Sequence, residues 1–134
     1  MSNHRLFNTM RMSQKKPKVL GRVMNLLLPS IKMKSYSPRG VLFDRELHSF
    51  LLTHFSGYTV TSGNITGYWK GHRHEEECNE HREYQIAIHR PNQRAILEKY
   101  LAHLAWELNE ESVYLTFEGK AFLILAEQNR TASK

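Results

Sequence analysis

Two segments with helical periodicity, each flanked by strand-like segments, constrain the fold of this chain most strongly. Apolar side chains recur on one helical face over residues 43–55 and again over 96–108. Strands are predicted at residues 18–28, 58–60, 65–69, 84–88, 113–117 and 121–126. This order predicts an α+β fold, a ferredoxin-like βαββαβ sandwich. Two helices would cover one face of an antiparallel sheet that carries an extra C-terminal strand.

Turn-forming and helix-ending residues separate these segments. Pro29 ends the first strand, and residues 30–41 are rich in serine, glycine and proline, which predicts a loop. Gly57 suits the end of the first helix, and Pro91 suits the start of the second. Residues 71–82 are predicted to form a polar loop. We expect a basic, disordered tail at 1–17, one domain at 18–127 and a C-terminal tail at 128–134.

The net charge of +6 is unevenly distributed along the chain. Residues 1–43 carry nine Lys or Arg and no acid, whereas residues 44–134 carry ten basic and thirteen acidic residues. A basic N-terminal arm of this kind binds nucleic acid in some proteins and is simply solvated in others. No apolar run approaches the roughly 20 residues that span a bilayer, so no membrane contact is expected. A single cysteine excludes an internal disulfide and fits a cytoplasmic setting.

The stretch before the fourth strand is rich in titratable residues. His72, His74, Cys78 and His81 provide nitrogen and sulfur atoms of the kind that bind zinc. Three consecutive glutamates interrupt the set, and one cysteine with three histidines is uncommon at structural zinc sites. The stretch is therefore interpreted as a solvated connector, with a metal site as the alternative. The predicted functional site contains no metal and no cofactor.

Glu83 differs from the other acids because it stands at the start of an alternating strand. A carboxylate beside a sheet surface is able to hold a substrate ammonium or sulfonium group. The aromatic residues Tyr58, Tyr68 and Trp69 accompany the preceding strands, and aromatic faces also stabilise cations. At strand spacing such rings more commonly belong to a core or an interface. Neither a nucleophile motif nor a phosphate-binding loop is present.

Several short pieces of the chain together match one known family. They are the Ser56-Gly57-Tyr58 turn, the Ile65-Thr66-Gly67-Tyr68 strand, Glu83 before an alternating strand, the 101–106 helix and the Ser112-Val113-Tyr114-Leu115 strand. On these pieces residues 47–125, roughly 80 residues, resemble the phage-type S-adenosylmethionine lyases, formerly called S-adenosylmethionine hydrolases.

The resemblance implies cleavage of S-adenosylmethionine to methylthioadenosine and homoserine lactone. The substrate's own carboxylate attacks its Cγ, so the enzyme orients and desolvates the substrate and needs no nucleophile. It further implies a homotrimer with substrate between subunits, and an anti-restriction role for a phage protein in the host cytoplasm. Glu83 is the expected catalytic residue, although Glu77 and Glu80 are alternatives for its role. The expected substrate-binding residues are Tyr58, Tyr68, Ile65, Glu80 and Gln85.

Two other functions are compatible with the same sequence. A ferredoxin-like sheet with one uncovered face could be a non-enzymatic, oligomeric binding module, because this architecture hosts many functions. The histidine-rich stretch or the basic arm could instead make the chain a small metal-binding or nucleic-acid-binding protein.

Overall fold

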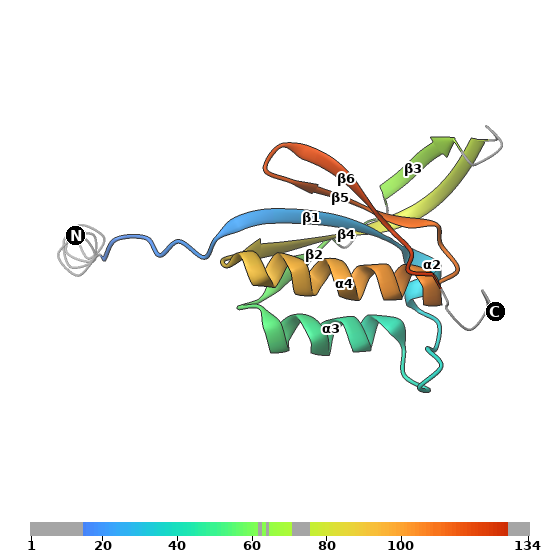
Figure 1. Ribbon diagram of the computed structural model, residues 1–134, viewed down its shortest axis with the longest axis horizontal. Coiled ribbons are helices and arrows are strands. Elements are labelled where there is room, and N and C mark those ends of the chain that lie inside the picture. The colour runs from blue at the N-terminus through green and yellow to red at the C-terminus, as the bar shows by residue number, and fades with distance from the viewer. Residues whose placement is uncertain (1–14, 62, 64, 71–75, 129–134) are drawn as a thin grey trace, which may run out of the picture.

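The computed structural model describes residues 15–61, 63, 65–70 and 76–128, with the backbone alone for 76–79. It contains a six-stranded sheet and three helices (Figure 1). In chain order the elements are β1 (Arg22–Pro29), α2 (Ser30–Met33), α3 (Phe43–His54), β2 (Tyr58–Val60), β3 (Ile65–Lys70), β4 (Glu76–Ile88), α4 (Pro91–Glu107), β5 (Ser112–Phe117) and β6 (Lys120–Leu125).

Strand β1 lies at the centre of an antiparallel sheet whose order is β2-β4-β1-β5-β6. The long strand β4 pairs with β2 near one end and with β3 near the other. Helix α3 connects β1 to β2, and both of these strands are antiparallel to β4, which lies between them. Helix α4 connects β4 to β5, and both are antiparallel to β1. The α+β class and the antiparallel sheet agree with the sequence-based prediction.

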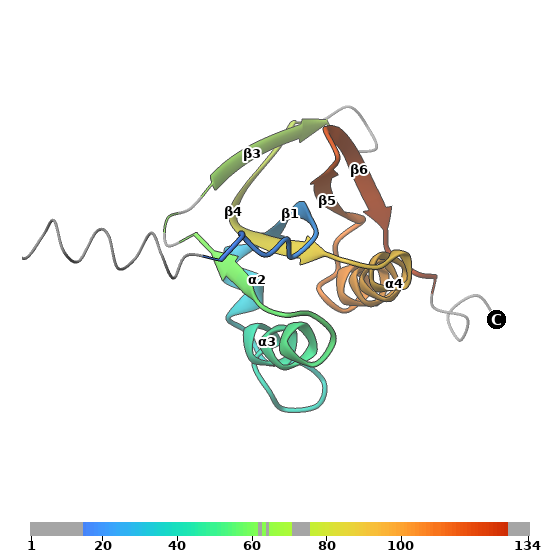
Figure 2. The same ribbon diagram turned by 90° about the vertical axis from the view of Figure 1, so that its left-hand side faces the viewer.

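The core lies between the sheet and its two long helices (Figure 2). Leu26 on β1 pairs with Tyr84 on β4 and with Leu115 on β5, and all three side chains are buried. Because side chains alternate along a strand, every second residue of these strands points toward the helices. The helices contribute Leu47 and Leu51 from α3, and Leu97, Leu101, Leu104 and Ala105 from α4.

A polar contact fixes the start of α3 on the sheet. The Tyr84 hydroxyl donates to Asp44 Oδ1 at 2.7 Å, and Arg82 Nη1 donates to Asp44 Oδ2 at 3.3 Å. Burial, and then the bond to Asp44, raise the pKa of Tyr84 well above its ordinary value, so the hydroxyl keeps its proton. Asp44 also lies in the first helical turn, where a negative charge is favourable.

None of the helices in the described residues covers the opposite face of the sheet. Figure 2 shows β3 and β6 rising on either side of β1 and β4, away from the helices, so this face is concave. We call it the open face. The segment 15–21 extends beyond one end of β1 (Figure 1). Among the described residues, no helix is both long enough and apolar enough to cross a membrane.

The structure corrects three predicted boundaries. The predicted 71–82 loop is wrong from Glu76 onward, because these residues pair with β3 and begin β4. The first strand begins at Arg22 rather than Lys18. Gly21 precedes it with a φ of +136°, and a Cβ there would lie 2.4 Å from the Ile88 carbonyl oxygen. The predicted 30–41 loop begins with α2.

The predicted tails fall mostly on residues 1–14 and 129–134, which lie outside the described part of the chain. The proposed boundaries at residues 18 and 127 therefore remain predictions.

Candidate functional site

A row of polar, uncharged side chains crosses the open face. The cross-strand register places Thr59, Gln85, Asn25 and Thr116 side by side on β2, β4, β1 and β5. Thr59 Oγ1 lies 3.4 Å from Gln85 Oε1. Directly paired residues share a face of the sheet, so these hydroxyl and amide groups form one continuous strip. Such groups are suited to hydrogen bonding with a polar ligand.

Glu83 lies in the next row along the same face. It pairs with Leu27 on β1, and Leu27 pairs with Tyr114 on β5. Two hydrogen bonds with Thr61 hold its backbone. The Thr61 N–H donates to the Glu83 carbonyl at 3.0 Å, and the Glu83 N–H donates to Thr61 Oγ1 at 3.2 Å. The half-buried Glu83 side chain therefore extends from a fixed backbone position, between the polar strip and Leu27.

An aromatic cavity lies on the same face beyond Glu83. The Trp69 ring lies 5.0 Å from the His81 ring and 6.4 Å from the Tyr114 ring, measured between centroids. These residues line a cavity of about 130 Å³ together with Leu27, Pro29 and others. Gly67 makes the arrangement possible, because a Cβ at that position would lie 1.8 Å from the Trp69 ring. The indole therefore covers Gly67 on β3 and reaches toward β5.

The structure brings together only part of the predicted site. Register places Glu83, Gln85 and Ile65 on the open face. Exposed Glu80 alternates with His81 along β4, and exposed Tyr68 alternates with Trp69 along β3, so both point to the opposite side.

Tyr58 also lies away from the open face. Its hydroxyl is 2.9 Å from His48 Nδ1 on α3. Burial, followed by the charge of Asp44, raises the pKa of Tyr58 above its ordinary value. In this arrangement the Tyr58 side chain belongs to the layer between the sheet and the helices.

Sequence reasoning did not select Asn25, Thr116 or Tyr114 as site residues. One signal was available, because Asn25 is a polar residue inside an otherwise apolar strand. Its significance depends on the pairing of β1 with both β4 and β5, which places Asn25 beside Gln85 and Thr116. That register is a long-range property and is not encoded in local periodicity.

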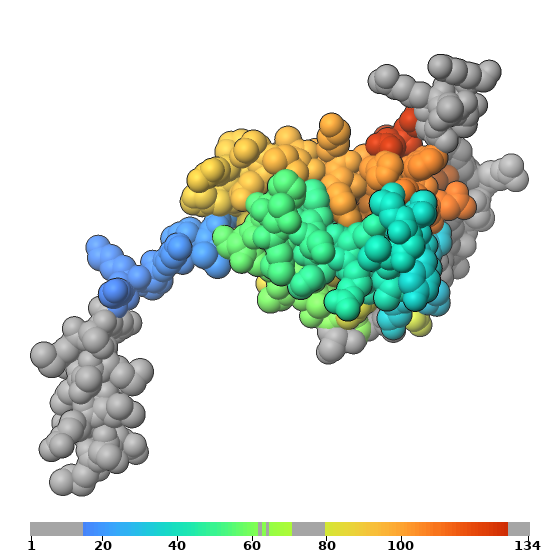
Figure 3. Space-filling model, turned by 90° about the horizontal axis from the view of Figure 1, so that it is seen from below, coloured from blue at the N-terminus to red at the C-terminus, as the bar shows by residue number. Residues whose placement is uncertain are grey.

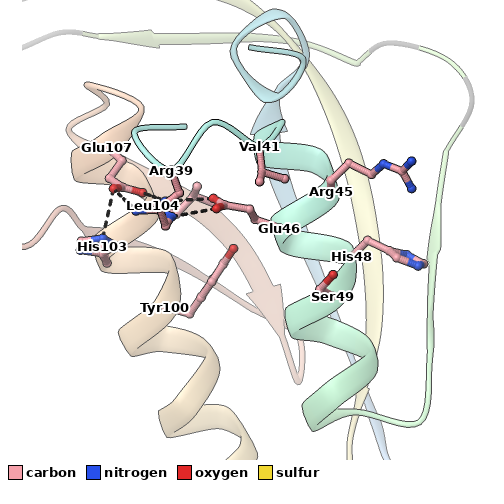
Figure 4. Close-up of a pocket in the computed structure, with 10 residues that line it drawn as sticks. All are labelled: Arg39, Val41, Arg45, Glu46, His48, Ser49, Tyr100, His103, Leu104 and Glu107. Atoms are coloured by element: carbon pink, nitrogen blue, oxygen red, sulfur yellow. Dashed lines mark hydrogen bonds and ion pairs between the residues drawn. The ribbon is translucent and has the colours of Figure 1, made fainter. Parts of the chain in front are cut away.

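A larger cleft, of about 610 Å³, lies between α3 and α4 (Figure 4). Arg39 crosses it and binds a carboxylate on each helix. Its Nε and Nη2 lie 2.7 and 2.9 Å from the Glu46 oxygens, and its Nη1 and Nη2 lie 2.8 and 2.6 Å from the Glu107 oxygens. One guanidinium thus joins the 30–42 segment to both long helices.

The charges in this cleft satisfy one another. Hydrogen bonding to Arg39 lowers the pKa of both Glu46 and Glu107 below their usual 4.5. Burial raises the pKa of the nearby Tyr100 hydroxyl to about 12. His103 and Glu107 form a further contact at 3.4 Å. Since Arg39 is already held by two carboxylates, the cleft is best explained as a brace between the helices, and the open face is the better candidate site.

In the part of the chain that the structure describes, no group of three or more His, Cys, Asp or Glu side chains is arranged to hold a metal ion. The zinc alternative also involves His72 and His74, which lie outside the described residues.

Comparison with known proteins gives one informative result. No protein-family model matches the sequence, and no curated protein matches it. A solved structure of a phage SAM lyase in complex with S-methyl-5'-thioadenosine is similar, with a TM-score of 0.54 and 9% sequence identity. The similarity covers 87% of this chain and 98% of that chain. At this identity the comparison establishes a shared fold.

Replacing Arg39 with Gln should lower the free energy of unfolding by about 1–3 kcal/mol, because nearly buried Glu107 loses its guanidinium partner and keeps only the longer contact with His103. Half of the Arg39 side chain is exposed, which keeps the loss toward the lower value. Urea unfolding measures the change, and Arg45→Gln on the exposed side of α3 is the matched control.

We also expect the destabilisation caused by Arg39→Gln to depend on pH. Glu46 and Glu107 have lowered pKa values in the folded protein, so their contribution is present above pH 4.5 and is lost as the pH falls. The stability difference between wild type and Arg39→Gln should therefore shrink on acidification below about pH 4. A difference that stays constant down to pH 3 would argue against the brace.

Replacing Gly67 with Ala should displace the Trp69 indole from His81, because the new methyl group would occupy the space of the ring. The expected result is a red-shifted and more readily quenched tryptophan fluorescence, reflecting greater exposure of the ring. Gly63→Ala is the control, since no atom lies within 4 Å of a Cβ at Gly63. Identical spectra for the two variants would contradict the described packing.

Proposed function

We propose that this protein is an S-adenosylmethionine lyase with a ferredoxin-like fold. The observation that carries the proposal is the likeness to the phage SAM lyase over nearly the whole of that chain. The sequence resemblance over residues 47–125 points to the same family. The open face adds the Glu83 carboxylate, a polar strip and aromatic rings, and Glu110 and Glu111 line its cavity. Carboxylates and aromatic faces are groups that suit a cationic nucleoside-bearing substrate.

The proposed reaction requires no nucleophile from the protein. The substrate's carboxylate oxygen forms a bond to its own Cγ, and the Cγ–S bond breaks with its electron pair going to sulfur. The positively charged sulfonium thereby leaves as the neutral thioether methylthioadenosine, and the remaining carbon chain closes as homoserine lactone. Correct orientation of carboxylate, Cγ and sulfur in a dry site is sufficient to accelerate such a step. No cofactor takes part.

The position of Glu83 supports a role in orienting the substrate. Its backbone is fixed by Thr61, and its side chain lies on the face that also carries Gln85 and Asn25. We assign it the role of holding the substrate ammonium group. Gln85 and Ile65 then contact the substrate from the same face. Tyr58, Tyr68 and Glu80 lie on other surfaces, so a role for them would require contact with a different part of the substrate or with a second subunit.

A second copy of the chain would complete the site. The cavity beside Trp69 has about 130 Å³, whereas ligand pockets usually have about 300–1,000 Å³. The open face also exposes Val23, Leu123 and Leu125, at 48%, 53% and 69% of their surface. Apolar side chains at this density favour association. We therefore propose a homo-oligomer, with a trimer as the expected form and with substrate held between subunits.

The proposed biological setting is that of a phage protein in the host cytoplasm. Removal of S-adenosylmethionine would deprive methylation-dependent restriction of its methyl donor.

A non-enzymatic oligomeric binding module is the second candidate. The exposed apolar side chains of the open face support it, because they favour a partner whether or not catalysis occurs. The two functions differ in one measurable property, which is turnover of S-adenosylmethionine.

Purified protein incubated with S-adenosylmethionine should produce methylthioadenosine and homoserine lactone, detected by chromatography. Glu83→Gln should reduce the rate by about 100-fold or more, because a charge-assisted contact in a desolvated site is lost. Glu80→Gln is the matched control on the same strand, and its rate should stay near that of wild type. Absence of turnover above buffer excludes the lyase. Equal losses in both variants contradict the role of Glu83.

Replacing Leu123 and Leu125 with Lys should dissociate the oligomer and abolish turnover together, because the charges would enter the interface. Light scattering should change from an oligomeric to a monomeric mass. Leu52→Lys on α3, where the leucine is 51% exposed, is the control and should change neither property. A wild-type protein that is monomeric and fully active would contradict the shared site.

A further inference from the structure

The two ends of the folded domain differ in how their charges are paired. Where α3 begins and α4 ends, the acids Asp44, Glu46, Glu107 and Glu110 are paired with Arg82, Arg39 and Lys32. The other end of the domain is where β1 begins, β4 ends and α4 begins (Figure 1). Its exposed or half-exposed cations are Arg22, Arg90, Arg94 and Lys120. The segment that leads into β1 adds Lys15, Lys16 and Lys18. We call this surface the basic end.

The basic end contains a cavity of about 480 Å³ lined by three arginines. Arg22 comes from β1, Arg90 from the residue before α4, and Arg94 from the first turns of α4. Val19, Pro91 and Phe117 provide apolar walls, and Glu118 adds one carboxylate to the lining. Residues distant in sequence thus place their guanidinium groups around one hollow. Guanidinium groups bind phosphate through two parallel hydrogen bonds, which distinguishes them from lysine.

The cavity is partly preorganised. The Arg94 guanidinium lies 5.1 Å from the Phe117 ring centroid and 4.9 Å from that of Phe122, and its Nε lies 2.5 Å from Glu98. Arg22 pairs with Glu118 at 2.9 Å, but both side chains are largely exposed, so this ion pair is weak. Among the described residues, no carboxylate pairs with Arg90 or Lys120. The basic end therefore keeps an excess of positive charge.

Residues 15–20 extend this surface outward. All six are exposed and lie outside any helix or strand. Figure 3 shows this segment leaving the domain beside the start of α4, and Val19 of the segment lines the cavity. Six extended residues span roughly 20 Å. Lys15, Lys16 and Lys18 thus form a line of cations that ends at the arginine cavity, and a linear polyanion matches such an arrangement better than a compact acidic patch does.

We propose that the basic end binds the phosphate backbone of nucleic acid. The exposed residues Tyr36, Tyr68 and Trp106 lie elsewhere on the domain, and His89 is the exposed ring that lines this cavity. One such ring offers stacking that tolerates any base, because every base has a flat aromatic face. Binding is therefore independent of base sequence and strongly dependent on salt. This site lies at one end of the sheet and is separate from the open face, so the proposal does not rest on lyase activity.

Fluorescence anisotropy with a labelled oligonucleotide of about 16 nucleotides tests the proposal across roughly 50–200 mM salt. The double variant Arg22→Gln and Arg90→Gln should lose at least about tenfold in affinity. The negative slope of log affinity against log salt should become shallower by about 1.4 for a single strand, that is, by about 0.7 for each lost phosphate contact. The control is Lys34→Gln with Arg45→Gln, which removes the same charge from exposed positions at the opposite end of the domain, where α3 begins.

Several outcomes would overturn the proposal. These are no binding at the lowest salt, an equal loss of affinity in the control variant, or a salt slope unchanged by the two arginine substitutions. Binding to vesicles that contain anionic lipid, with no binding to the oligonucleotide, would assign the basic end to a membrane surface instead. Circular dichroism and thermal unfolding of both double variants establish that they are folded. A second oligonucleotide of unrelated sequence should bind with the same affinity.

Discussion

The pairing of β1 with both β4 and β5 is the constraint on which the remaining structure depends. Eight residue pairs join β1 to β4 in antiparallel register, and four pairs join β1 to β5. Because side chains alternate along a strand, this register decides simultaneously which residues enter the core and which reach the open face. Leu26 is buried beneath the helices, while Asn25 and Leu27 lie on the other side. A slip of one residue would exchange these two sets and remove both the core and the candidate site.

The two faces of the sheet then serve different physical purposes. The helical face is closed by apolar packing and by polar contacts that satisfy one another, such as Arg39 with Glu46 and Glu107, or Tyr84 with Asp44. The open face retains Glu83, a polar strip and exposed leucines. The side chains of the open face are not needed to pack the core, so they are available to a ligand or a partner. This contrast, more than the size of any cavity, favours the open face as the functional surface.

Local sequence patterns predicted much of the fold. The periodicity of residues 43–55 and 96–108, with Pro91 and Gly57 near their boundaries, identified α3 and α4 to within one or two residues. The start of β4 was missed because Glu76 to Arg82 are polar, and a polar segment is typical of a loop. Pairing with β3 supplies the hydrogen bonds that hold it as a strand. Of the predicted site residues, Glu83, Gln85 and Ile65 share a face, whereas Tyr58 is directed toward His48.

The sequence by itself determined the order of elements, the α+β class and the concentration of basic residues before Asp44, because these depend on local periodicity and composition. The tertiary structure decided which polar residues meet. It placed Asn25 beside Gln85 and Thr116, and it gathered Arg22, Arg90 and Arg94 around one cavity. The physical reason is that strand order and register arise from contacts between distant segments. Such contacts are selected by the burial of a whole core, and no short stretch of sequence specifies them alone.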